Sequence, residues 1–158
     1  MVINRQRRVS VASPPLERFF ARIAELLQIS PDSATVCLVT DAQIARWNRV
    51  YRGKARPTDV LSFPADAVAT KKRVGRNGFK PTNGRRNSSS RNGSYLGDIA
   101  IAPAVARRNA QESGRTFDHE LRVLILHGVL HLLGHDHETD TGQMERLELR
   151  LRRQLGIQ

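Results

Sequence analysis

The chain has little cysteine and no long apolar segment, and both absences limit what it can be. Cys37 is the only cysteine among its 158 residues, so no disulfide can form within the chain. It lies in the apolar run ATVCLVT, which is typical of a buried strand and not of a reactive thiol. No segment approaches the roughly 18 apolar residues that span a bilayer. The basic start MVINRQRRVSVASPP also lacks the apolar core of a secretory signal, so we expect a soluble cytoplasmic protein.

The positive charge is large and unevenly distributed. The chain has 26 Lys or Arg against 15 Asp or Glu, a net charge of +11. Such a balance favours polyanionic partners, either nucleic acid or an anionic membrane surface. Residues 65–95 alone carry eight Lys or Arg and one Asp, which leaves only +4 for the rest of the chain. The charge is therefore concentrated in one segment.

That segment breaks the pattern of the surrounding sequence. Residues 66–94 are rich in Gly, Ser, Asn and Arg and have few apolar side chains to bury. We expect a disordered basic insertion at about 66–94, within a single domain that spans residues 1–158. Two interpretations of its role stay open. It can tether RNA through phosphate contacts, or it can be a tolerated surface insertion, since loop closure costs little more as a loop lengthens.

The periodicity of the apolar residues predicts an α+β fold. We expect a small mixed sheet in which residues 58–64 and 95–102 pair as a β-hairpin, packed with helices around a buried central helix that binds metal. Thr40 or Asp41 is expected to cap one helix, and Asp140 with Gln143 to form a capping box for the last one. The expected strands are residues 7–11, 34–39, 58–64 and 95–102; the expected helices are residues 16–27, 41–50, 103–114, 118–133 and 140–156.

Four of the five histidines fall in the stretch HGVLHLLGHDH, residues 127–137. On a helix, His127 and His131 project from one face, one turn apart, and can share a metal ion. Gly134 allows the chain to leave the helix through a left-handed turn, after which His137 can return toward the pair. Three imidazoles suit zinc and leave a fourth position for water, which is typical of a catalytic site. We therefore predict one zinc ion per chain.

The spacing of these histidines is also that of the metzincin proteases, which carry Glu as general base after the first His. Gly128 occupies that position here, so the base for peptide hydrolysis is missing. The string instead resembles the H-G-x-L-H-L-x-G-[YH]-D-H signature of the YbeY family. The segments YRGKARPTDVLSFP, residues 51–64, and LGDI, residues 96–99, resemble two further stretches of that family.

The resemblance implies a metal-dependent endoribonuclease that is specific for single-stranded RNA. It also implies a role in ribosomal RNA maturation and ribosome quality control, with ribosomal RNA and the small ribosomal subunit as partners. Arg52 matches an arginine that the family needs for activity. Phosphoryl chemistry supplies a reason, because a guanidinium can grip phosphate oxygens and stabilise charge that develops on phosphorus. From the residues alone, a surface arginine of a basic stretch is the preferred interpretation of Arg52.

Several alternatives stay open at this point. Asp136 can orient a metal ligand or can simply form the turn after Gly134. We assign no catalytic role to His135, because the family tolerates Tyr at its position. A metallopeptidase is disfavoured by Gly128. A ribosome-binding assembly factor with a structural metal and little nuclease activity stays compatible with the sequence. The sequence also leaves the oligomeric state open.

Overall fold

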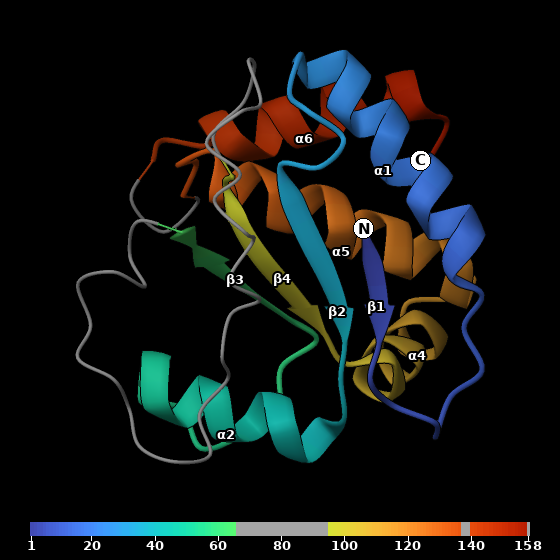
Figure 1. Ribbon diagram of the computed structural model, residues 1–158, viewed down its shortest axis with the longest axis vertical. Coiled ribbons are helices and arrows are strands. Elements are labelled where there is room, and N and C mark those ends of the chain that lie inside the picture. The colour runs from blue at the N-terminus through green and yellow to red at the C-terminus, as the bar shows by residue number, and fades with distance from the viewer. Residues whose placement is uncertain (66–94, 137–139, 158) are drawn as a thin grey trace.

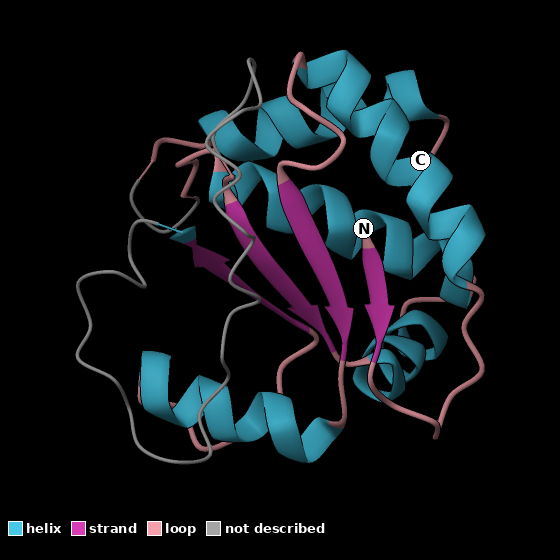
Figure 2. Cartoon of the chain, viewed as in Figure 1, coloured by secondary structure: helices cyan, strands magenta, loops and turns pink. Residues whose placement is uncertain are grey.

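A four-stranded mixed sheet and five helices make up the described part of the computed structural model, which covers residues 1–65, 95–136 and 140–157. The spatial order of the strands is β1-β2-β4-β3 (Figure 1). Strands β1, β2 and β4 run parallel, and β3 is antiparallel to β4. The predicted α+β class with a mixed sheet is confirmed (Figure 2). The strand bounds are Val2–Asn4 for β1, Ala34–Leu38 for β2, Val60–Pro64 for β3 and Gly97–Ile101 for β4.

Strands β3 and β4 form the predicted antiparallel pair. Val60 lies opposite Ile101, and Phe63 lies opposite Asp98. Gly97 opens β4 with a φ of +144°, and a Cβ there would come within 2.1 Å of the Phe63 carbonyl oxygen. Only glycine permits this close approach of the two strands. The basic insertion expected at 66–94, which follows β3 in the sequence, lies outside the described residues.

The five predicted helices are present, with ends that shift by a few residues. Thr40 is the cap of α2: its hydroxyl accepts a hydrogen bond from the Gln43 backbone amide, and the Gln43 side-chain oxygen accepts one from the Thr40 backbone amide, which together form a capping box. The helix bounds are Ser13–Leu27 for α1, Asp41–Arg52 for α2, Pro103–Glu112 for α4, Phe117–Leu132 for α5 and Gln143–Leu155 for α6.

The sheet separates two apolar clusters. Strand residues such as Val36 and Ile99 pack with α1, α5 and α6 on one face. Cys37 and Phe63 pack with Trp47 of α2 on the other face, where α2 lies apart from the other helices (Figure 1). Burial, helped by the charge of Asp98, raises the pKa of the Cys37 thiol to about 11, which agrees with the predicted unreactive cysteine.

Helix α5 is the central helix of the fold. It packs against β3 and β4 of the sheet and against α1, α4 and α6. Its buried side chains point in nearly every direction, as expected for a helix that is apolar all round. The burial and the contacts of α5 agree with the central position predicted for residues 118–133. Metal binding by this helix stays a prediction.

Two local predictions are wrong. Residues 7–11 form no strand; the N-terminal edge strand is β1. The Gln6 side chain hydrogen-bonds both the amide and the carbonyl of Val9, which holds this segment in a loop. Asp140 and Gln143 form no capping box. Helix α6 begins at Gln143, after Gly142, and the Asp140 carboxylate accepts hydrogen bonds from the Gly142 and Met144 amides. Asp140, two residues before the Gly142 cap, thus provides a partner for the Met144 amide in the first turn of the helix.

Within residues 1–65, 95–136 and 140–157, no helix combines the length and the apolar character that crossing a membrane would require.

Candidate functional site

The two histidines of α5 face each other. Thr116 caps the helix by accepting a hydrogen bond from the His119 amide, and the apolar run that follows anchors the last three turns in the core. His127 and His131 lie one turn apart, as predicted. Their Nε2 atoms are 3.1 Å apart, and their ring centroids are separated by 4.6 Å at an interplanar angle of 76°. Two ring nitrogens thus converge on one point beside the helix.

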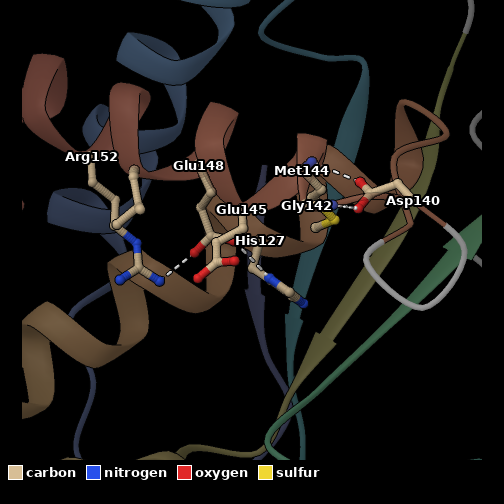
Figure 3. Close-up of a pocket in the computed structure, with 8 residues that line it drawn as sticks. His127, Asp140, Gly142, Met144, Glu145, Glu148 and Arg152 are labelled. Carbon is tan, nitrogen blue, oxygen red and sulfur yellow. Dashed lines mark hydrogen bonds and ion pairs between the residues drawn. The ribbon is translucent and has the colours of Figure 1, made fainter.

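An ion pair on α6 lies behind His127. The Nδ1 atom of His127 is 2.9 Å from Oε2 of Glu148, and Oε1 of the same carboxylate accepts a hydrogen bond from Arg152 (Figure 3). Burial by itself raises the pKa of Glu148. The hydrogen bond from His127 and the charge of Arg152 outweigh that effect and hold the pKa below its ordinary value. Glu148 is therefore an ionised carboxylate at neutral pH.

The histidine pair fits a shared metal ion. Two Zn–N bonds of about 2.0–2.1 Å at a tetrahedral angle place the two nitrogens about 3.3 Å apart. The observed Nε2 separation of 3.1 Å is close to that value. The described residues, which exclude 137–139, contain no group of three His, Cys, Asp or Glu placed to hold a metal. The third predicted ligand, His137, lies outside the described residues.

The turn after α5 has the predicted glycine geometry. The helix ends at Leu132, and Gly134 follows with a φ of +90°, in the left-handed region. The amides of Gly134 and His135 donate to the carbonyls of His131 and Leu130 and so close the last helical turn. The carbonyl of Asp136 accepts from the Asp140 amide, so this residue contributes to the turn. A role of the Asp136 side chain behind a metal ligand stays a prediction.

Gly128 lies where α5 crosses the sheet. A Cβ at this position would come within 2.6 Å of Cγ2 of Ile99 on β4. The hydroxyl of Ser62 on β3 also donates a hydrogen bond of 3.1 Å to the Gly128 carbonyl. The absence of a side chain therefore allows the helix to approach the strands closely. A glutamate at this position, as a peptidase would need, has no room in this packing.

Arg52 lies on a different helix from the histidines, on the other face of the sheet. It is the exposed last residue of α2, whose Tyr51 and Trp47 rings contact Phe63 of β3 at centroid distances of 5.0 and 6.0 Å. Helix α5 meets the opposite face of the same strand. Strand β3 is an edge strand, so α2, which ends at Arg52, and α5, which carries the histidine pair, pack on the two faces of one border strand of the sheet. The structure brings His127 and His131 together and leaves Arg52 across the strand.

A cavity of about 440 Å³ opens beside His127, and its other lining residues come from Asp140 to Arg152. Figure 3 shows that Glu148, one of these lining residues, lies between His127 and Arg152. Neither member of this ion pair was predicted from the sequence. A signal was present, since Glu148 follows Met144 by four residues and precedes Leu151 by three, which places a carboxylate on the apolar face of an amphipathic helix.

Comparison with known proteins agrees with this arrangement. The family model described as "Endoribonuclease YbeY" matches residues 1–156. Two proteins named "Endoribonuclease YbeY" are similar over 99% of this chain: one from Solibacter usitatus, 38% identical over 88% of its own length, and one from Koribacter versatilis, 36% identical over 86%.

The fold is also similar to a known structure. The solution structure of TM1509 from Thermotoga maritima is 26% identical and superposes with a TM-score of 0.57, covering 98% of this chain and 89% of that protein. The family match extends over nearly the whole sequence, including both histidines and Arg52. The chain therefore belongs to the YbeY family of endoribonucleases.

Proposed function

We propose that this protein is a zinc-dependent endoribonuclease that cleaves single-stranded RNA during ribosomal RNA maturation and ribosome quality control. Its membership of a family whose named relatives are endoribonucleases supports the reaction class. The observation that carries the metal-dependent part is the convergence of the His127 and His131 Nε2 atoms at 3.1 Å. A net charge of +11 suits a polyanionic substrate.

The proposed ligands are His127, His131 and His137, with one zinc ion per chain. Three imidazoles leave one coordination position open for water or substrate. When bound, the ion supplies Lewis-acid chemistry: it polarises a phosphoryl oxygen or activates water at neutral pH. The hydrogen bond from His127 Nδ1 to Glu148 supports this assignment, because ligating histidines characteristically donate their second ring N–H to a carboxylate.

Arg52 is the proposed residue that stabilises the developing charge on the phosphate. Its guanidinium has five N–H donors in a fixed planar arrangement that matches phosphate oxygens. A strand of RNA that passes along the β3 edge would meet Arg52 from one face of the sheet and the histidine pair from the other. In this proposal Arg52 grips the scissile phosphate and holds it in position while the phosphodiester bond breaks.

Peptide hydrolysis is not supported. Gly128 provides no general base, and its contact with Ile99 leaves no space for one. The remaining alternative is a ribosome-binding assembly factor with a structural metal. A cytoplasmic location and an association with the small ribosomal subunit belong to this proposal, and they follow from the expected substrate.

The test is cleavage of labelled RNA by the zinc-loaded protein. Single-stranded RNA and a duplex of the same sequence are compared, with His131→Ala and Arg52→Ala as controls for contaminating nuclease. We expect cleavage of the single strand, slower cleavage of the duplex and loss of activity in both variants. Equal cleavage by wild type and variants contradicts the proposal. Binding to the small subunit without cleavage would favour the assembly factor.

A further inference from the structure

The carboxylate of Glu148 bridges two helices. Its Oε2 atom lies 2.9 Å from Nδ1 of His127 on α5, and its Oε1 atom accepts from the Arg152 guanidinium one turn along α6. Glu148 is 8% exposed, and the Arg152 side chain is 20% exposed. Each oxygen therefore has one partner in a largely buried setting. The intrahelical pair with Arg152 leaves Oε2 directed across the interface at the ring of His127.

The chemistry of the partners fixes the proton on His127. An ionised carboxylate only accepts hydrogen bonds, so Nδ1 of His127 must be the donor. In the neutral ring the lone pair is then on Nε2. That atom is the one that faces His131 Nε2 at 3.1 Å. The arrangement thus holds His127 in the tautomer that a metal ligand needs.

We infer that Glu148 is a positioning residue that keeps the Nε2 lone pair of His127 available to a metal ion, and that Arg152 holds Glu148 in place. This inference rests on the metal centre proposed above. A purely structural alternative exists, in which Glu148 only ties α6 to α5. The two roles differ in what happens when the carboxylate is replaced by an amide of the same shape.

Glu148→Gln separates the two roles. Arg152 can only donate, so it takes the amide oxygen and turns the amide NH₂ toward His127 Nδ1. Nδ1 must then accept, which transfers the ring proton to Nε2 and blocks the ligand atom. Adding Arg152→Met removes the competing donor, so the amide can rotate and offer its oxygen to Nδ1. The double variant should therefore bind metal better than Glu148→Gln alone, although it retains fewer polar contacts.

The experiment measures zinc affinity by competition with a chromophoric chelator, together with ring ¹⁵N chemical shifts of His127 in the metal-free protein. We expect Glu148→Gln to weaken zinc binding roughly 10- to 100-fold, the usual cost of losing such a partner. Its His127 proton should move from Nδ1 to Nε2. The double variant should recover most of the affinity and return the proton to Nδ1. Arg152→Met alone should weaken binding less than Glu148→Gln.

Two results would overturn the inference. Unchanged zinc affinity in Glu148→Gln would show that the carboxylate has no part in metal binding. A double variant that binds no better than Glu148→Gln, with thermal stability lower still, would support the purely structural tie. Either result leaves the metal centre intact, provided that the wild type binds zinc and His131→Ala does not. Failure of the wild type to bind zinc would contradict the metal centre and this inference together.

Discussion

The two halves of the candidate site lie on opposite faces of β3 and are fixed in different ways. On one face, His127 belongs to a buried helix, and a carboxylate that is itself paired with Arg152 holds its ring. On the other face, Arg52 is the exposed end of α2, and the rings of Trp47 and Tyr51 anchor that helix on Phe63. The first arrangement suits a ligand whose atoms must be placed precisely. The second suits a long cationic side chain that follows a flexible polymer.

The largest expected effect is on RNA cleavage and concerns Arg52, on the α2 face of β3. Its replacement should affect catalysis and leave folding unchanged. Arg52→Ala should lower RNA cleavage by roughly 10² or more, the usual scale for losing a donor that stabilises transition-state charge. Zinc content and melting temperature should stay close to wild type, because Arg52 is an exposed helix end. Single-turnover cleavage assays measure this.

Arg49→Ala is the matched control, since it removes a neighbouring arginine of the same helix. A comparable loss of cleavage in Arg49→Ala would indicate a general basic surface and would contradict a specific role for Arg52.

A smaller effect is expected on the α5 face, where close packing determines the result. Alanine exceeds glycine in helix propensity by about 1 kcal/mol, so Gly128→Ala would stabilise the protein if there were space. The added Cβ instead lies 2.6 Å from Ile99 Cγ2. We expect net destabilisation of about 1–3 kcal/mol, the usual cost of overpacking.

Denaturant unfolding of Gly128→Ala provides the measurement. A variant more stable than wild type would show that α5 does not approach β4 as closely as described.

The smallest effect concerns the start of α6, which carries Glu148. Hydrogen bonds from the Met144 and Gly142 amides hold the pKa of Asp140 below its ordinary value. A lowered folded-state pKa means that the carboxylate contributes stability at neutral pH and loses it as the pH falls through that pKa. Asp140→Ala should therefore be less stable than wild type at neutral pH, and the difference should shrink in acid.

The measurement is thermal unfolding of metal-free wild type and Asp140→Ala from neutral pH into acid. Glu145→Gln, in the same first turn, controls for the loss of one negative charge. A difference that stays constant with pH would contradict the role of the Asp140 carboxylate.

Periodicity was sufficient to predict the central helix and the two strands β3 and β4, because each of these elements is encoded locally. Val60 and Leu61 alternate across a strand, and the residues around His127 are apolar in every direction. The edge strand was misplaced because Val2–Asn4 is defined by its parallel partner β2 and by no local pattern.

Glu148 was missed for a similar reason. Its function depends on a ring 21 residues earlier in the chain, on another helix. The side of the sheet on which Arg52 lies is likewise set by the crossover from β2 through α2 to β3, which motif spacing does not describe. Local pattern thus predicted the elements and the histidine pair, and tertiary packing decided what lies beside them.

The most direct test of the metal centre is the zinc content of three proteins purified without added metal. Wild type should hold one ion per chain and His131→Ala none. His119→Ala removes a histidine from the first turn of the same helix, away from the pair, and should keep the full equivalent. A full equivalent of zinc in His131→Ala would contradict the account, because the ion would then be held by other residues.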